Sequence, residues 1–541
     1  MSTSPISATN PEVSSTALAG SEFTVSRPMR IALGLALCLA AGGGICLRWV
    51  GMNAQSMWAD EGYTTWLTQY PPSVILKLLP TDNHPPLYYL LLHFWRGLFG
   101  SSVFALRGFS ALCSTLCLPV MYLLARKIFN SRLCGLIAFA FASLSFFQIW
   151  YAKEVRDYAL LELLSSLCVY CMVLTLETAT RGRLVVLAVL LAALFYTHNM
   201  AWFYAPGFLV FWFCYPSEME FRGRLKRGLV VAGIALALFV SWIRPMWVQV
   251  RLVHKNFWPA KPGANDLLRT FCIFCGIDAD DLHFTLQTHL PRIRLFGFRT
   301  WATIVLLCLG IGFFYGIRNK ESAVRRKVLA ITSIAFLPIF LVFVDSRLFT
   351  SVYINRVLIG AGVFLPLLFL APIAFAKGGN RLLQLSPAFG MLIAVCLSLA
   401  VQKEQKDNWR GVTRYVLGLP EPQRVVFAFQ PFCQILMNYY ADQLAHPGKS
   451  VPITGLMSQA DLEDATNPDP GIPPLSNADP IGLLDSAIAS GRYKEIDVAL
   501  QMFRLPPSLV AMPGFLSTHC ASVSTADFNQ IRVTRCVLAP H

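Results

Sequence analysis

Long apolar stretches recur between residues 31 and 401, and they constrain the fold more than any other feature. A helix needs about 20 residues to cross a bilayer, and eleven stretches approach or exceed that length. Only 14% of the residues are charged, against about 25% in ordinary soluble proteins. We therefore predict an α-helical polytopic membrane protein. The predicted spans are residues 31–50, 102–125, 133–151, 158–177, 183–198, 200–216, 229–247, 300–317, 328–344, 352–373 and 384–401.

The basic residues indicate how the chain crosses the membrane. Lys and Arg collect in cytoplasmic loops, and alternate loops between the predicted spans are basic. We therefore expect the N-terminus in the cytoplasm and, after eleven spans of the inner or plasma membrane, residues 402–541 outside it. This tail contains 11 Lys and Arg and 13 Asp and Glu, so the net charge of +15 comes from the membrane part. That distribution argues for topology-setting charge and against a nucleic-acid partner.

The chain divides into three regions. Residues 1–26 are polar and rich in Ser and Thr, so we expect a disordered N-terminal tail. Residues 27–401 are predicted to form the transmembrane domain, with long outer loops at 51–101 and 248–299. Within the first outer loop, residues 85–99 are predicted to form an amphipathic helix lying in the membrane interface. The first apolar run has no clear cleavage site, so we interpret it as a retained signal anchor.

The tail, residues 402–541, has the composition of a small soluble α/β domain. Residues 425–429 and 531–538 are predicted strands, and residues 432–441 form a predicted helix. Residues 466–480 are rich in Pro, Asn and Asp, which is typical of a loop. With the tail on the extracytoplasmic side, we expect a disulfide between Cys520 and Cys536.

Acidic and imidazole side chains gather on one side of the membrane under this topology. Ionisable groups near membrane depth are costly and are usually functional. Their convergence predicts an outward-facing polar site close to the lipid headgroups. The residues are Asp60, Glu61, Asp82, His84, Glu154, Asp157 and His198.

The segment Trp58-Ala-Asp-Glu61 follows the first predicted span. A carboxylate of Asp60 or Glu61 can act there as a general base toward an acceptor hydroxyl. The alternative is a hydrated loop acid that helps to orient the first span.

The segment Asp82-Asn-His-Pro-Pro precedes the predicted interfacial helix. Asp82 and His84 can supply oxygen and nitrogen ligands to a divalent metal ion. The favoured alternative is a helix start fixed by proline and capped by Asp82 or Asn83.

Four charges lie within five residues in Lys153-Glu-Val-Arg-Asp157, between two predicted spans. Arg156 is a candidate partner for a lipid phosphate, and a solvated turn with internal salt bridges is the equal alternative. His198 and Arg356 mark two further outer helix ends. Arg356 is a second candidate for phosphate binding, although it can instead extend its side chain to the interface.

Together these motifs resemble the GT-C class of glycosyltransferases, in particular the protein-mannosyltransferase-like enzymes of bacteria. The resemblance rests on Trp58–Glu61, on His84-Pro-Pro-Leu-Tyr-Tyr89 and on Tyr151 to Tyr158, with looser matches at Asn355-Arg356 and Asp407–Arg410. It covers roughly residues 55–200 in order and spacing. The sequence departs from the aminoarabinose transferases at Asn83-His84, where they have Glu-Lys, and at Tyr63, where they have Arg.

The resemblance implies a GT-C fold and an inverting transfer of a sugar from a polyprenyl-phosphate carrier. The acceptor would be a lipid, a glycan or a protein at the outer face of the membrane. Asp60 would be the catalytic acid of the first loop, Glu61 its partner and Glu154 or Asp157 the second acidic position. Substrate binding would fall to Arg156, Asp157, Tyr158, His198 and Arg356, and a divalent ion would be held by Asp82 and His84.

Two other functions remain open from the sequence. A transporter or flippase of polyisoprenoid-linked sugars often has repeated halves, and no repeat is visible here. A non-catalytic membrane scaffold would use the tail to bind a partner. Transfer of labelled sugar separates the enzyme from both.

Overall fold

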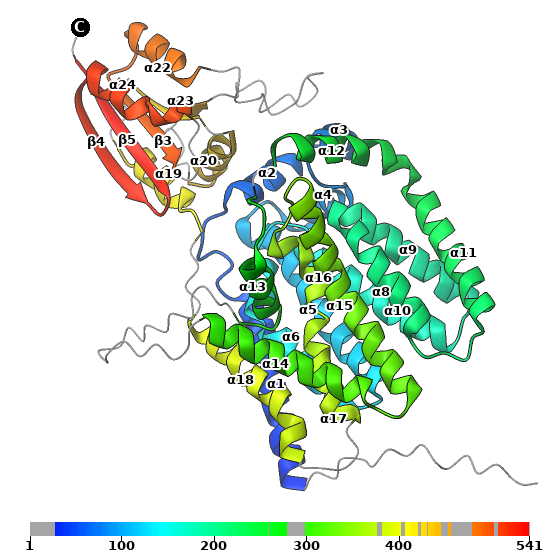
Figure 1. Ribbon diagram of the computed structural model, residues 1–541. Coiled ribbons are helices and arrows are strands. Elements are labelled where there is room, and N and C mark those ends of the chain that lie inside the picture. The colour runs from blue at the N-terminus through cyan, green and yellow to red at the C-terminus, as the bar shows by residue number, and fades with distance from the viewer. Residues whose placement is uncertain are drawn as a thin grey trace, which may run out of the picture.

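The computed structural model describes two parts of the chain, a bundle of helices followed by a tail that contains a sheet (Figure 1). The described residues are 27–257, 259–277, 298–375, 381–401, 406–419, 423–429, 431–444, 453–455, 479–502 and 507–539. The predicted disordered segment 1–26, the end of the second outer loop and most of the predicted loop 466–480 lie outside them.

The helical part begins with α1 and a set of short helices in the first outer loop. The helix predicted at residues 85–99 is present as α4, and its interfacial position stays a prediction; its Phe94, Leu98 and Phe99 are exposed. These large apolar side chains suit the headgroup region of a membrane. The elements are α1 (Arg27–Trp49), α2 (Ala59–Leu67), α3 (Pro72–Leu78), η1 (Leu79–Thr81) and α4 (Leu87–Phe99).

The bundle continues through long helices with polar caps. Ser102 and Ser131 accept backbone N–H groups at the starts of α5 and α6, and Asn130 ends α5 in the left-handed region. The elements are α5 (Val103–Phe129), α6 (Arg132–Leu144), α7 (Phe146–Ala152), α8 (Tyr158–Glu177), α9 (Arg181–Thr197), η2 (Asn199–Tyr204), α10 (Ala205–Cys214), α11 (Phe221–Phe239), η3 (Val240–Trp242) and α12 (Ile243–Asn256).

Among the remaining helices of the bundle, the short α16 packs on α8. Ser165 and Tyr204 donate to the carbonyls of Gly360 and Val357, which the broken helix near residue 360 leaves free. The elements are α13 (Ala264–Phe274), α14 (Phe298–Ile317), α15 (Ser322–Leu348), η4 (Asn355–Leu358), α16 (Ile359–Gly362), η5 (Leu365–Leu370), α17 (Ala371–Phe375) and α18 (Arg381–Val401).

Within the described residues, six helical segments are long and apolar enough to cross a membrane, or seven if one bent pair is a single span. The predicted number of eleven is therefore not confirmed. The predicted span 133–151 is bent by 57° between α6 and α7. The buried Arg48 of α1 stabilises this bend, because its guanidinium donates to the carbonyls of Ala142 and Ser143, both at 2.8 Å.

The tail contains a five-stranded mixed sheet in the order β2-β1-β3-β5-β4. The β1–β2 and β1–β3 pairs are parallel, whereas β5 is antiparallel to both of its neighbours. Strands β1 and β5 coincide with the two predicted strands to within a residue. The elements are α19 (Trp409–Leu417), β1 (Arg424–Ala428), α20 (Pro431–Leu444), β2 (Ile453–Gly455), α22 (Pro480–Ala489), β3 (Glu495–Gln501), α23 (Pro507–Val510), α24 (Met512–His519), β4 (Cys520–Phe528) and β5 (Ile531–Leu538).

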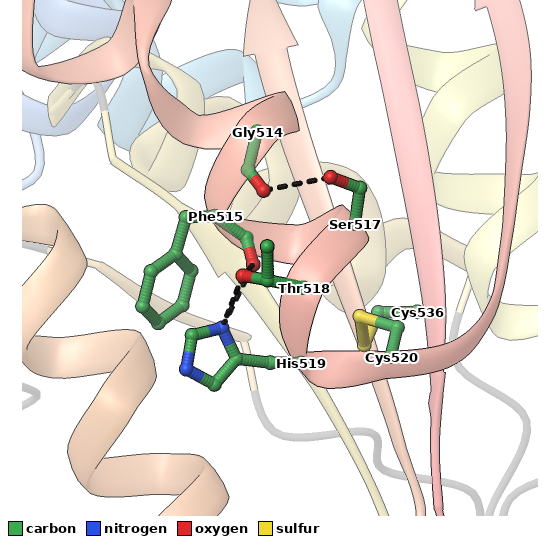
Figure 2. The surroundings of a disulfide bond; sticks show 7 residues. All are labelled: Gly514, Phe515, Ser517, Thr518, His519, Cys520 and Cys536. Carbon is green, nitrogen blue, oxygen red and sulfur yellow. Dashed lines mark hydrogen bonds between the residues drawn. A yellow bond between two sulfur atoms is a disulfide. The ribbon is translucent and has the colours of Figure 1, made fainter.

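The expected disulfide between Cys520 and Cys536 is present and joins the first residue of β4 to β5 (Figure 2). It fixes β4, the outermost strand of the sheet, to its neighbour. Helix α24 leads directly into β4, and the ring of its last residue, His519, stacks on Phe515 at 4.2 Å.

Candidate active site

The candidate site lies where three segments of the helical part meet. Helix α2 supplies Asp60 and Glu61, the turn between α7 and α8 supplies Glu154 to Asp157, and η4 supplies Arg356. Side-chain contacts join these segments although they lie far apart along the chain. Asp60 and Arg356, for example, are 296 residues apart. The predicted convergence of charged groups is thus present in the structure.

Glu61 is fully buried and serves as an anchor for these segments. Arg107 donates to both of its carboxylate oxygens at 2.8 Å, and the N–H of Val155 donates to Oε1 at 3.0 Å. Burial alone would raise the pKa of Glu61, but the charges of Arg107 and Lys406 together with these hydrogen bonds lower it to about 2. Glu61 is therefore a charged, enclosed group that does not face an opening.

Arg107 also fixes the backbone that precedes α2. Its guanidinium donates to the carbonyls of Met52, Gln55 and Ser56. An arginine side chain has five N–H donors, and Arg107 forms five hydrogen bonds here. No role for Arg107 was predicted from the sequence, because the backbone and the carboxylate that it binds lie about 50 residues away.

Lys406 enters the same cluster from the tail, and sequence reasoning missed it. Its ammonium lies 3.1 Å from Glu61 Oε2 and 3.2 Å from Glu154 Oε1, and its side chain is only 6% exposed. Burial raises the pKa of Glu154, and the charge of Lys406 opposes that rise. A single lysine ahead of the Asp407 motif carries no local signal, because its two partners lie far away in the sequence.

Asp60 faces a different environment from its neighbour Glu61. Its carboxylate is 30% exposed and lies 3.4 Å from the Arg356 guanidinium. That guanidinium also lies over the rings of Trp58 at 5.1 Å and Tyr158 at 5.8 Å, within cation–π distance. Asp60 is thus an accessible carboxylate held beside a cation and two aromatic rings.

Arg156 forms the second cationic position of the site. It is buried and donates to Thr64 Oγ1 at 3.2 Å, to the Tyr89 hydroxyl at 3.4 Å and to His84 Nε2 at 2.9 Å. The guanidinium also lies 5.9 Å from the centre of the Tyr158 ring. Arg156 and Arg356 therefore approach one tyrosine ring, and both are suited to bind a phosphate.

His84 lies beside two further predicted site residues, Asp157 and His198. One ligand atom from each of these three residues lies within 4.8 Å of the others. Asp157 Oδ2 and His198 Nε2 are buried and have no hydrogen-bond partner among the described residues. Burial raises the pKa of Asp157, with the charges of His84 and Arg156 in opposition. The donor types fit a divalent ion such as zinc. His198 Nδ1 accepts the N–H of Met200 at 3.0 Å, so an ion at His198 Nε2 would require loss of this hydrogen bond.

Asp82, predicted as a metal ligand, lies outside that three-residue group. Its carboxylate contacts the other ring nitrogen of His84, Nδ1, at 3.3 Å and accepts from the Tyr89 hydroxyl at 3.1 Å. A carboxylate on the far nitrogen orients a ligating imidazole. Although burial opposes it, the hydrogen bond and charge of His84 lower the pKa of Asp82. Asp82 thus lies beside His84 and outside the three-residue group, and its part in metal binding stays a prediction.

Two amide side chains support the loop that carries His84. Gln249 on α12 donates to the carbonyls of Leu79 and His84 at 2.8 and 2.9 Å. Asn199 donates to the carbonyl of Asn83 and to Gln249 Oε1. Neither amide was predicted from the sequence, since both act on backbone atoms of a distant loop.

Comparisons with known proteins agree with this arrangement. Residues 83–245 match the family model described as dolichyl-phosphate-mannose-protein mannosyltransferase. No curated protein matches the sequence significantly. The match includes the His84 loop, the Glu154–Asp157 turn and His198.

Several solved structures are similar in fold. ArnT from Cupriavidus metallidurans, bound to undecaprenyl phosphate, has a TM-score of 0.50 at 13% identity, covering 96% of this chain and 100% of that one. The Archaeoglobus fulgidus oligosaccharyltransferase, in complex with Zn and sulfate, has a TM-score of 0.47 at 11% identity, covering 86% and 68%. The S. cerevisiae Pmt1-Pmt2 complex has a TM-score of 0.32 at 15% identity, covering 44% and 36%.

The last two similarities are too weak to support an argument, whereas the ArnT structure matches over nearly the full length of both chains. The resemblance predicted from the sequence is thus confirmed: residues 83–245 match the mannosyltransferase family model, and the fold is similar to that of ArnT, a GT-C glycosyltransferase.

Proposed function

We propose that this protein is an inverting glycosyltransferase that moves a sugar from a polyprenyl-phosphate carrier to an acceptor at the outer face of the membrane. The match at residues 83–245 supports the reaction class, and the similar ArnT structure holds undecaprenyl phosphate. The proposed orientation has the N-terminus in the cytoplasm and the tail outside it. The acceptor is a lipid, a glycan or a protein.

The environment of Asp60 is the observation that carries the proposal. A partly exposed carboxylate lies 3.4 Å from Arg356, and the guanidinium groups of Arg156 and Arg356 lie 5.9 and 5.8 Å from the centre of the Tyr158 ring. A general base and two phosphate-binding cations are the groups that this transfer needs. A membrane scaffold would not need a buried cationic pair beside an open carboxylate.

In the proposed reaction, Asp60 accepts the proton of the acceptor hydroxyl as its oxygen attacks the anomeric carbon. The bond between that carbon and the phosphate oxygen breaks, and both electrons leave with the polyprenyl phosphate. The leaving phosphate gains a negative charge, which Arg156 and Arg356 stabilise. Attack from the face opposite the phosphate inverts the anomeric configuration.

The other predicted site residues have supporting roles in this proposal. Tyr158 presents its ring to both guanidinium groups, and Asp157 and His198 face the same space as His84. Glu61 and Glu154, predicted as catalytic, are enclosed by Arg107 and Lys406. We therefore assign them to positioning of the loops and leave the proton transfer to Asp60 alone.

A divalent ion would be held by His84, Asp157 and His198, where it would supply positive charge near the phosphate. His84 Nε2 is also the contact of Arg156, so ion and guanidinium compete for one atom. Metal analysis of the purified protein tests this part. We expect about one zinc ion per chain, reduced in His198→Ala. Zinc content that is unaffected by His198→Ala would exclude the cluster.

The test of the proposed function is Asp60→Asn, compared in cells with the wild type and with a deletion. We expect the variant to be folded, to lose transfer by about 100-fold or more and to accumulate a polyprenyl-phosphate sugar in lipid extracts. The matched control is Asp485→Asn, which changes an exposed carboxylate of α22. Undecaprenyl phosphate should still bind purified Asp60→Asn, since Arg156 and Arg356 are unchanged.

Two results would overturn the proposal. Normal glycoconjugates in the Asp60→Asn cells, beside a defect in the deletion, would remove the assigned base. Labelled lipid-linked sugar that crosses proteoliposomes without loss of its sugar would identify a transporter instead.

A further inference from the structure

Lys406 of the tail forms ion pairs within the candidate site. Its ammonium bridges Glu61 of α2 and Glu154 of the turn between α7 and α8. These two carboxylates belong to the segments that carry Asp60 and Arg156. A lysine that follows the last helix of the bundle therefore joins the two halves of the site.

The tail sheet holds Lys406 in place. Asn529, in the turn between β4 and β5, donates to the carbonyl of Lys406 at 2.8 Å. Gln501, at the end of β3, donates to Asp407 Oδ2 at 2.7 Å, and the Asp407 carbonyl accepts from Ser56 at 2.9 Å. The backbone around Lys406 is thus fixed by the sheet on one side and by the loop before α2 on the other.

Helix α2 also packs directly on the tail. A Cβ added to Gly62 would lie 2.6 Å from Leu436 Cγ of α20, so a larger residue at this position would separate the two helices. Nearby, the Tyr440 hydroxyl accepts the N–H of Met57 at 2.7 Å. Gly62 follows Asp60 by two residues, so the seating of α20 bears on the position of the proposed base.

We propose that Lys406 is a positioning residue that couples docking of the tail to assembly of the active site. When the tail is seated, the ammonium holds Glu61 and Glu154 together and so fixes Asp60 relative to Arg156. Without it, two buried carboxylates face each other with Arg107 bound to only one of them. This inference rests on the proposed function only for its effect on turnover.

The first measurement is hydrogen exchange of the full-length protein in detergent, which requires no substrate. Lys406→Met should accelerate exchange in residues 56–64 and 153–157, because the N–H groups of Trp58 and Val155 donate to Glu61. Exchange in α11, far from the cluster, should not change. The matched control, Lys494→Met, removes an exposed lysine of the tail and should leave both segments as in the wild type.

The second measurement is turnover, followed as release of undecaprenyl phosphate from the lipid-linked sugar that accumulates in Asp60→Asn cells. Lys406→Met should lower kcat by about 100-fold through misplacement of the base, with a much smaller change in KM. Adding Glu154→Gln should restore much of the rate, because it removes one of the two opposed charges. A loss of activity unrelated to these two charges would not be reversed by Glu154→Gln.

Gly62→Ala perturbs the same contact without a change in charge. It should accelerate exchange in residues 56–64 and lower kcat, and Leu436→Ala should reverse both effects by making room for the added methyl group. This pair keeps the test valid if Lys406→Met does not fold.

Unchanged exchange in both Lys406→Met and Gly62→Ala would overturn the inference, whatever their activities. Faster exchange with normal kcat would show that the tail stabilises the loops without positioning the base, which also refutes it. If the exchange results hold but the wild type transfers no sugar, the coupling stands and the proposed function fails.

Discussion

Glu61→Gln should reduce stability far more than substitution of the adjacent Asp60. In the folded protein, the pKa of Glu61 falls from an ordinary 4.5 to about 2. That difference corresponds to about 3 kcal/mol of stabilisation at neutral pH. Loss of one partner from a buried ion pair costs about 3–5 kcal/mol in measured cases, so the two approaches agree. We therefore expect Glu61→Gln to lower the free energy of unfolding by about 3 kcal/mol.

The pH dependence gives this prediction its sign. Because the pKa of Glu61 is depressed in the folded state, its stabilisation is fully present above about pH 4.5 and is lost as the pH falls toward about 2. The free energy of unfolding of the wild type should therefore exceed that of Glu61→Gln by a constant amount from pH 6 to pH 8. This difference should shrink only in acid, below about pH 4.5.

Unfolding in mixed micelles with increasing sodium dodecyl sulfate measures the free energy at pH 7. Asp60→Asn is the comparison, since the Asp60 carboxylate is partly exposed and has a single long contact with Arg356, at 3.4 Å, which should contribute about 1 kcal/mol. A Glu61→Gln protein as stable as the wild type, but inactive, would refute the anchoring role and return Glu61 to the list of catalytic groups. A loss of stability in Asp60→Asn as large as that in Glu61→Gln would refute the expected difference between the two substitutions.

Three further predictions concern the tail and the His84 loop. Replacing Cys520 and Cys536, which are 16 residues apart, by serine should cost about 3 kcal/mol and accelerate exchange of β4 amides in the full-length protein; unchanged exchange would contradict this. Burial raises the pKa of Asp407 from an ordinary 3.8 to about 6, so its ionisation destabilises the fold progressively as the pH rises from about 4 to about 6 and by a constant amount above that. The Tm of Asp407→Asn should therefore exceed that of the wild type by a margin that grows from pH 4 to pH 6 and is constant from pH 7 to pH 8, and a margin that does not change with pH would contradict this. Gln249→Leu frees the carbonyl of His84 and should lower zinc affinity about 10–100-fold in a titration with zinc chloride, whereas unchanged affinity would argue against the metal cluster.

Hydropathy predicted the parts of the fold that depend on composition alone. Helices α5 and α8 lie where the apolar runs placed them, because a membrane helix satisfies its own backbone. The bend between α6 and α7 could not be predicted, since Arg48 stabilises it from about 95 residues away. The broken segment after residue 355 likewise depends on Ser165 and Tyr204, which bind carbonyls that a regular helix would not expose.

The site was predictable to the extent that topology alone determines it. Residues at the outer ends of successive helices must share one surface, which is why Asp60, Arg156 and Arg356 could be grouped before their contacts were known. The side chains that contact these site residues could not be predicted from the topology. Lys406 lies 345 positions from Glu61, and only the docking of the tail brings the two together.

The geometry of α2 separates the roles of its two neighbouring carboxylates. Successive residues of an α-helix point about 100° apart, so Asp60 and Glu61 face different surroundings. Glu61 points into the protein, where Arg107 and Lys406 enclose it, and Asp60 points toward Arg356. Gly62 then meets the tail at the next step around the helix. One turn of helix thus carries an anchor, a candidate base and a docking contact, and a shift of the tail should change all three together.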